Sequence, residues 1–98
     1  MTMNKYTPDY TTGFRRNRRA LIKRGLDMTK LESTIDLLLT GKPMPQKYRD
    51  HPLKGNFKEY RECHVDGDGD WLIIYKKYED KLVLVFTATG THADLFER

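Results

Sequence analysis

Residues 71–75, WLIIY, and residues 82–86, LVLVF, decide the fold class of this 98-residue chain. Both runs are apolar along their whole length, which predicts two central strands covered on both faces. Glu79 and Asp80 predict the turn between them. A third strand, of mixed polarity, is expected over residues 57–65, so the three strands should form an antiparallel meander.

Shorter elements are expected around this meander. The acidic run DGDGD at residues 66–70 predicts a turn. It also resembles a calcium loop, but it lacks the later glutamate of an EF-hand and a following helix, so the turn is favoured. Residues 2–6 are expected to add an edge strand, and residues 91–96 a short terminal helix or turn.

Two helices are predicted in the first half of the chain. Residues 7–9, Thr-Pro-Asp, favour a helix start, since a hydroxyl cap precedes a proline and an acid, and Gly25 ends that helix. Asp27 caps the second helix and Gly41 ends it. Apolar residues recur at helical spacing in both, at Tyr10, Phe14 and Leu21 and then at Met28, Leu31, Ile35, Leu38 and Leu39. A helical hairpin packed on one face of a sheet gives an α+β fold, expected here as one domain over residues 1–98.

The charge of the chain is unevenly distributed. The net charge is +4, but residues 1–50 hold 11 Lys and Arg against 5 Asp and Glu, whereas residues 51–98 hold 7 against 9. This asymmetry favours a polyanionic partner. No apolar run approaches the length of about 18 residues that spans a bilayer, so no membrane association is expected. The lone cysteine, Cys63, cannot form an internal disulfide, and a cytoplasmic location is expected.

Most of the basic charge lies on the first predicted helix. The residues concerned surround every direction that the apolar stripe leaves open, and they are Arg15, Arg16, Arg18, Arg19, Lys23 and Arg24. Contact with an RNA phosphate backbone explains this density, and a solvated outer face explains it equally well.

All three histidines, His51, His64 and His92, lie in the second half of the chain, at expected strand or loop ends. Imidazole transfers protons near neutral pH, so three of them in a small basic protein favour acid–base chemistry. Their spacing matches no standard zinc motif, and we expect neither a metal nor another cofactor. Cys63 alternates away from His64 on a strand, which argues against a Cys–His nucleophilic pair.

Four runs of sequence together resemble one family. They are YRDHPLKG at residues 48–55, YRECHV at 60–65, DWLIIY at 70–75 and TGTHADLF at 89–96. In this order they resemble the YafQ branch of the RelE/ParE toxin superfamily, over about residues 5–96. The resemblance implies the toxin of a bacterial type II toxin–antitoxin pair, with a RelE-like fold of a helical pair on an antiparallel sheet. It also implies a ribosome-dependent mRNA endonuclease, in which a ribose 2′-hydroxyl attacks the adjacent phosphate.

The resemblance also assigns site residues. By their places in the motifs, the implied catalytic set is His51, His64, Asp70, His92 and Phe96. Asp70 is the least secure of these, because the loop before Trp71 is longer than in the family pattern. Phe96 stacks on a base or anchors the terminus in the core.

One position departs from the family pattern. An arginine usually precedes the Thr-Gly-Thr/Ser-His motif, but this chain has Ala88 there. Such an arginine would stabilise the charge of the transition state, so its absence implies an impaired enzyme or a substitute cation. Arg61 and Lys54 are the nearest substitutes by motif, and both are also expected to bind RNA or the ribosome.

Two other functions stay open at this point. Ala88 favours a member of the fold that binds the ribosome or an antitoxin without cleaving. A gyrase-targeting toxin of the ParE type shares the fold, but the three histidines argue against it. The expected partners are a cognate antitoxin, in a hetero-oligomer with this chain, and the ribosome with its mRNA.

Overall fold

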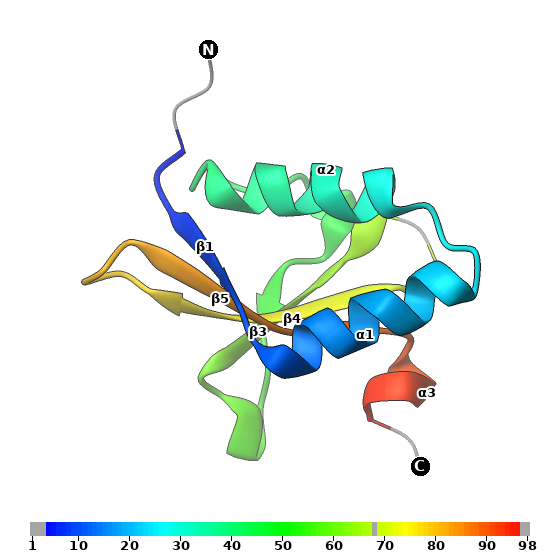
Figure 1. The fold of residues 1–98 in the computed structure, drawn as a ribbon. Coiled ribbons are helices and arrows are strands. Elements are labelled where there is room, and N and C mark those ends of the chain that lie inside the picture. The colour runs from blue at the N-terminus through cyan, green and yellow to red at the C-terminus, as the bar shows by residue number, and fades with distance from the viewer. Residues whose placement is uncertain (1–3, 68, 97–98) are drawn as a thin grey trace.

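The computed structural model describes residues 4–67 and 69–96, and it confirms the α+β fold (Figure 1). Helix α2 lies above the sheet in this view and α3 lies below it. The helices and strands, in chain order, are β1 (Thr7–Tyr10), α1 (Thr12–Lys23), α2 (Met28–Leu39), β2 (His51–Pro52), β3 (Tyr60–His64), β4 (Leu72–Tyr78), β5 (Val83–Gly90) and α3 (His92–Leu95). Three single turns of 3₁₀ helix interrupt the connections, η1 (Gln46–Tyr48), η2 (Gly55–Phe57) and η3 (Val65–Gly67).

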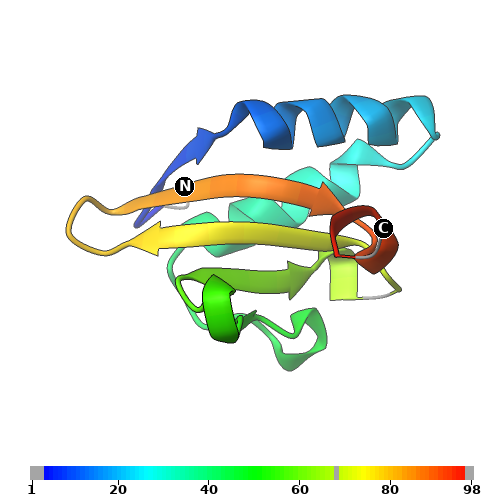
Figure 2. The ribbon, with the colours of Figure 1, turned by 90° about the horizontal axis from the view of Figure 1, so that it is seen from below.

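The five strands form one sheet in the order β1-β5-β4-β3-β2. The meander of β3, β4 and β5 is confirmed, with antiparallel pairing throughout. The sheet as a whole is mixed, because β1 pairs in parallel with β5. Figure 2 shows β4 and β5 as the long central strands, with α3 over one end of them.

The predicted start of the first helix at residues 7–9 is wrong. Those residues belong to β1, and the helix begins at Thr12. The backbone of β1 pairs with residues 83–86 of β5, and this pairing outweighs the local cap signal. The true cap is Thr11, whose hydroxyl accepts from the Phe14 N–H at 3.0 Å. The edge strand therefore lies later than the expected residues 2–6, of which residues 2 and 3 fall outside the described range.

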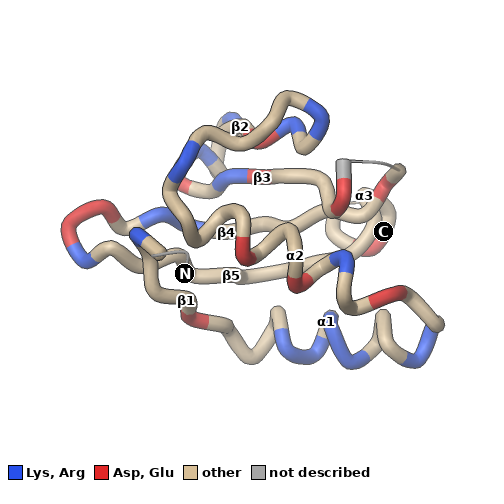
Figure 3. Tube along the Cα trace, turned by 90° about the horizontal axis from the view of Figure 1, so that it is seen from above, with Lys and Arg blue, Asp and Glu red and all other residues tan. Residues whose placement is uncertain are grey.

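Beyond the end of β1, helix α1 and its cap cover the edge of the sheet and bond to the backbone of β5. The Asn17 side-chain oxygen accepts from the Thr89 N–H at 3.2 Å, and the Thr11 hydroxyl donates to the Thr87 carbonyl at 3.1 Å. Two side chains thus satisfy backbone groups of β5 that no strand reaches. Figures 2 and 3 both show α1 running along this edge.

The second helix confirms its predicted stripe and its predicted cap. The Asp27 carboxylate accepts from the Thr29 N–H, and Gly41 follows the helix with a positive φ of 77°. The stripe packs on one face of the sheet, with Leu31, Ile35, Leu38 and Leu39 buried against Cys63, Ile73 and Tyr75. Each such aliphatic side chain contributes about 1.5–3 kcal/mol by leaving water. Among the described residues, no helix is long and apolar enough to cross a membrane.

The connections differ most from the sequence-based expectation. β3 begins only at Tyr60, because residues 55–57 form η2, and the short strand β2 was not predicted. The acidic turn at residues 66–70 is confirmed in part, with Asp66 at a φ of 57° and Gly69 at 69°. Asp68 lies outside the described residues.

Candidate functional site

The predicted catalytic histidines gather at the sheet face opposite α2. Along β3, Cys63 points into the core under α2, so its neighbours Glu62 and His64 point to the other face. This confirms that Cys63 and His64 do not form a pair. Burial raises the pKa of the Cys63 thiol far above its usual value, which leaves it protonated and unreactive.

His64 is held in one orientation by the turn that follows β3. Its Nδ1 lies 3.1 Å from the Gly69 carbonyl oxygen, which can only accept, so Nδ1 carries a hydrogen. In the neutral ring, the lone pair is then on Nε2. The side chain is 7% exposed, and its ring centroid lies 6.2 Å from that of His92.

His92 is the first residue of α3, and its side chain contacts Asp70, which lies in the turn before β4. The Asp70 carboxylate accepts from both the backbone N–H of His92 and its ring Nδ1. These hydrogen bonds from His92 hold the pKa of Asp70 below its usual value, so Asp70 stays an anion. Asp70 thus lies beside His92, although the loop before Trp71 is longer than in the family pattern. Within residues 4–67 and 69–96, His92 Nε2 forms no hydrogen bond.

A capping box fixes the helix that carries His92. The Thr91 hydroxyl accepts from the Asp94 N–H, and the Asp94 carboxylate accepts from the Thr91 N–H. Arg24, at the end of α1, donates to the same carboxylate at 2.9 Å. The Thr91 N–H and Arg24 both lower the pKa of Asp94. Arg24, expected to bind RNA, pairs with Asp94 in this structure.

His51 joins the site from β2, where it pairs with Glu62 of β3. Its Nε2 lies 3.0 Å from a Glu62 carboxylate oxygen, and its Nδ1 lies 3.0 Å from the Pro52 carbonyl oxygen. Both ring nitrogens thus face acceptors, and both can donate only in the imidazolium form. His51 therefore has no ring nitrogen free for a substrate in this arrangement. Glu62 was missed from the sequence, although its position two residues before His64 places it on the same face.

Asp50, the residue before β2, fixes the segment that carries His51 through contacts with Tyr75 and Arg61. The buried Tyr75 hydroxyl donates to Asp50 at 2.6 Å, and Arg61 approaches the same carboxylate at 3.4 Å. Burial and this hydrogen bond raise the pKa of Tyr75. Arg61 also lies 3.3 Å from the Tyr75 hydroxyl, on the core side of β3. The structure therefore places Arg61 away from the histidines, and it is not positioned as the substitute cation.

Ala88 lies on the histidine face, opposite Ile74 of β4. It lines a hollow of about 220 Å³, together with Phe57, Tyr60, Ile74, Thr87, Leu95 and Phe96. Phe96 is 44% exposed, so it is not a core anchor, and its ring centroid lies 6.1 Å from that of His92. Lys54 is exposed at the start of η2, on the loop that leads to Phe57.

A cation missed from the sequence borders this hollow. Lys76 pairs with Tyr60 across β4 and β3, and its Nζ lies 4.7 Å from the Tyr60 ring centroid. Its side chain is 25% exposed and also lies 3.7 Å from Glu59. A lysine flanked by aromatic and aliphatic surface keeps its charge at the rim of the hollow.

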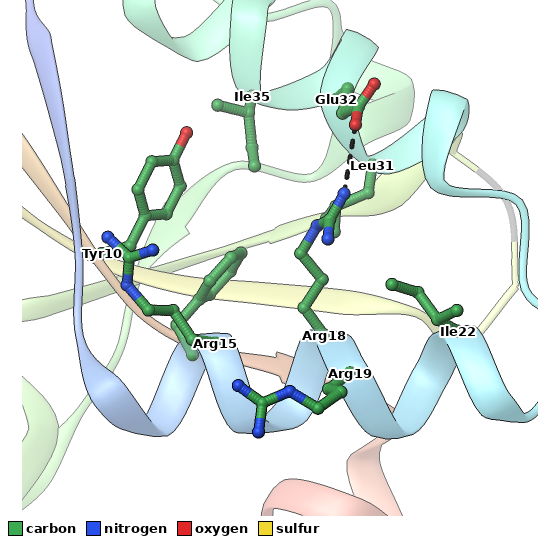
Figure 4. A pocket seen from close by; sticks show the side chains of 9 residues that line it. Tyr10, Arg15, Arg18, Arg19, Ile22, Leu31, Glu32 and Ile35 are labelled. Carbon is green, nitrogen blue, oxygen red and sulfur yellow. Dashed lines mark hydrogen bonds and ion pairs between the residues drawn. The ribbon is translucent and has the colours of Figure 1, made fainter.

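The basic residues of α1 border a different surface, the groove between α1 and α2 (Figure 3). Figure 4 shows its two sides, with Tyr10 and Ile22 on one and Leu31 and Ile35 on the other. The groove has a volume of about 530 Å³, and its lining includes Arg15, Arg18 and Arg19. Arg18 crosses it to pair with Glu32 at 3.2 Å. Arg16 and Lys23 are exposed on the rest of the helix.

The described acids near His51 and His92 are arranged with them as separate pairs. Within residues 4–67 and 69–96, no three His, Cys, Asp or Glu side chains are grouped so that they could hold an ion. The acids near the histidines are each committed to one ring, Glu62 to His51 and Asp70 to His92. The arrangement is suited to proton transfer between fixed imidazoles and a substrate.

Comparison with known proteins agrees with the fold. The family described as "Bacterial toxin of type II toxin-antitoxin system, YafQ" matches residues 6–97. The mRNA interferase toxin YafQ of Escherichia coli (strain K12) is 44% identical over 89 residues, which cover 90% of this chain and 92% of that protein.

Two solved structures have the same fold. A chain of the E. coli DinJ-YafQ toxin–antitoxin complex superposes with a TM-score of 0.83 at 39% identity, covering 94% of this chain and 98% of that one. A metal-bound toxin from Helicobacter pylori superposes with a TM-score of 0.83 at 34% identity, over 93% of this chain and 99% of that one. This chain therefore belongs to the YafQ family, the toxins of bacterial type II toxin–antitoxin systems.

Proposed function

We propose that this chain is an endoribonuclease that cuts mRNA on the ribosome. The observation that carries the proposal is the pair of imidazoles, His64 and His92, whose ring centroids lie 6.2 Å apart. In each ring Nδ1 faces an oxygen acceptor, so in the neutral ring the lone pair is on Nε2. Cleavage by a 2′-hydroxyl needs one base and one acid on either side of a phosphorus atom, each within hydrogen-bond reach. Two rings this close can both reach the oxygens of one phosphate that lies at their edges.

The hydrogen bonds of the two rings suggest their roles. Neutral His64 accepts the proton of the 2′-hydroxyl on Nε2, and the oxygen then attacks the adjacent phosphorus. A new bond from the 2′-oxygen to phosphorus forms as the bond from phosphorus to the 5′-oxygen breaks. Protonated His92 donates its proton to the departing 5′-oxygen, and Asp70 balances the positive charge of the ring before that step. The products are a 2′,3′-cyclic phosphate and a 5′-hydroxyl.

His51 and residue 88 bear on the charge of the transition state rather than on proton transfer. His51 is held by Glu62 and Pro52 at the edge of the site, where both ring nitrogens donate when the ring is an imidazolium. Ala88 supplies no charge where the family pattern has an arginine, so the phosphorane is stabilised less than in an arginine-bearing relative. We infer that the chain is a slow member of the family, with a binding function that persists when cleavage is weak.

The small size of the site favours dependence on a scaffold. The rings and the hollow contact one or two nucleotides at most, so alignment of the substrate must come from elsewhere. The basic residues of α1 lie at the outer edge of the sheet, where they are able to meet ribosomal RNA through electrostatic contacts.

The groove between α1 and α2 supports an antitoxin as the protein partner. Its apolar lining includes Ile22, which is 46% exposed, and its rim carries Arg15 and Arg19. An acidic amphipathic segment that folds on binding complements both features. The groove lies away from the histidine face, so such a segment can hold the toxin without filling the site.

The test is cleavage of a defined mRNA by purified protein, with and without programmed ribosomes. We expect cuts only with ribosomes, and fragments that end in a 2′,3′-cyclic phosphate. His92→Ala should remove the cuts, whereas the matched surface variant Tyr78→Ala should retain them, because Tyr78 lies on the β4–β5 hairpin away from the site. Efficient, sequence-selective cutting of naked RNA at physiological salt would contradict the proposal.

A further inference from the structure

The hollow beside the histidines has walls that are unusually aromatic and open. Phe57 is 53% exposed and Phe96 is 44% exposed. Their ring centroids lie 6.5 Å apart at an interplanar angle of 81°, and Phe57 and Tyr60 lie 6.3 Å apart at 61°. Rings from η2, β3 and the end of α3 thus converge on one space, although they are far apart in the sequence. Exposed rings gathered in this way mark a binding surface.

Ala88 contributes a small side chain to the lining of this hollow. It lies on β5 opposite Ile74, and both line the hollow. A longer side chain at residue 88 would project from the same face into the hollow, since side chains stand perpendicular to a sheet. The residue that removes a cation from the site therefore also opens a slot in it.

The surroundings of the hollow fit a nucleotide. On one side, the Phe96 ring lies 6.1 Å from the His92 ring, so the hollow adjoins the place of the reacting phosphate. On the other side, Lys76 lies over the Tyr60 ring, 4.7 Å from its centroid, and offers a positive charge. The length of β3 between His64 and Tyr60 is four residues, or ~13 Å. A phosphate beyond the hollow would thus meet Lys76 while the scissile phosphate meets the histidines.

We propose that the hollow formed by Phe57, Tyr60, Ala88 and Phe96 binds the base of a nucleotide next to the scissile phosphate. This inference rests on the proposed function. The volume of about 220 Å³ is smaller than a typical ligand pocket and fits one ring system. Aromatic walls accept the face of any base, so the slot selects for stacking strength, with purines preferred.

A fluorescent base tests the slot without requiring cleavage. The probe is an mRNA with 2-aminopurine at one of the two nucleotides that flank the cut, bound to programmed ribosomes. Stacking quenches 2-aminopurine, so the chain should quench it at one of the two positions. Phe57→Ala should remove the quenching, while Tyr78→Ala should retain it. Phe57 is half exposed, so its replacement should leave the fold intact, and a thermal unfolding curve checks this.

A double-mutant cycle that combines a protein variant with a modified mRNA adds an independent measurement. The chain and its Phe57→Ala variant are compared on an mRNA with the base present and with an abasic ribose at the quenched position. On the complete mRNA, Phe57→Ala should raise the half-saturating concentration by ~10-fold, as loss of one stacked base predicts. On the abasic mRNA, it should change that concentration less than about twofold.

The outcomes separate this inference from the proposed function. Quenching without cleavage would overturn the endonuclease and leave the slot standing. Ribosome-dependent cleavage with no quenching at either position, or with equal effects of Phe57→Ala on both mRNAs, would overturn the slot alone. Failure to bind programmed ribosomes at all would overturn both.

Discussion

The Nε2 atom of His51 lies 3.0 Å from a carboxylate oxygen of Glu62, directly across the β2–β3 ladder. Glu62 is 6% exposed, so a buried carboxylate has this histidine as its partner. The pair explains why a strand of only two residues is held in register. Both ring nitrogens of His51 are already engaged, so we expect His51 to affect the site without transferring a proton itself.

Glu62→Gln tests this relationship. The amide oxygen can still accept from His51 Nε2, but it lacks the negative charge that favours the imidazolium form. We expect the maximal cleavage rate to fall by about 10-fold, and His51→Ala in the Glu62→Gln background to add little, because the two residues act as a unit. Single-turnover cleavage on programmed ribosomes measures both. If the fold-reductions in cleavage rate of the two single variants multiply in the Glu62→Gln/His51→Ala double variant, His51 acts independently of Glu62.

Asp70→Asn tests the orientation of His92. The variant keeps the shape of the side chain but lacks the charge that balances a protonated ring. We expect the maximal rate to fall by about 100-fold, within the range of a general acid, with ribosome affinity unchanged. Asp80→Asn, in the β4–β5 turn, is the matched control. Equal rates for the Asp70→Asn variant and the unaltered chain would remove Asp70 from the site.

Ala88→Arg tests whether residue 88 limits the rate. A guanidinium near the phosphorane stabilises charge that develops only in the transition state, and one such donor contributes about 100- to 1000-fold. We expect a rise of that order in the maximal rate and greater toxicity in cells. The arginine side chain would also narrow the hollow that is proposed to bind a base. The half-saturating concentration of the mRNA should therefore not fall. His92→Ala in this background should abolish the gain.

The outcome at residue 88 also decides whether the chain is impaired. Equal maximal rates with alanine and arginine would show that another cation already serves the phosphorane, and Lys76 is the one that borders the hollow. In that case Lys76→Met should lower the rate of the chain as it stands.

Ile22→Asp tests the groove as the antitoxin surface. Ile22 is 46% exposed in the groove, and Leu37, which is 38% exposed outside it, provides the matched control. We expect Ile22→Asp to weaken antitoxin binding by ~30-fold, the effect of losing one central contact, and to leave cleavage unchanged. Leu37→Asp should change neither. Calorimetric titration with the antitoxin measures the affinities, and equal weakening by both variants would place the antitoxin elsewhere.

Tyr75→Phe tests the anchor beneath His51. The buried hydroxyl donates to the Asp50 carboxylate at 2.6 Å, and its removal leaves that charge with Arg61 alone. We expect the free energy of unfolding to fall by about 1.5–3 kcal/mol, as for a hydrogen bond to a charged group. Urea denaturation measures the change. Tyr78→Phe, at an exposed position, should be neutral, and a similar loss there would show that the Asp50 contact is not the cause.

The sequence by itself determined the elements whose signals are local. The stripe of α2 repeats at helical spacing, and its ends carry an N-cap and a glycine at positive φ, so both the helix and its buried face were predictable. The two apolar runs predicted β4 and β5 for the same reason. The motifs likewise identified the family and the three histidines, because these depend on residue type and order.

Only the tertiary structure decided what depends on contacts between distant residues. The segment at residues 7–9 carries a helix-start signal, yet it forms β1, because the backbone hydrogen bonds that β5 offers outweigh a local preference. Strand β2 exists only through its pairing with β3, which also joins His51 to Glu62. The hollow around Ala88 forms because register and chain reversal bring Phe57 and Phe96 together. Such contacts join residues up to tens of positions apart, and no local pattern in the sequence encodes their geometry.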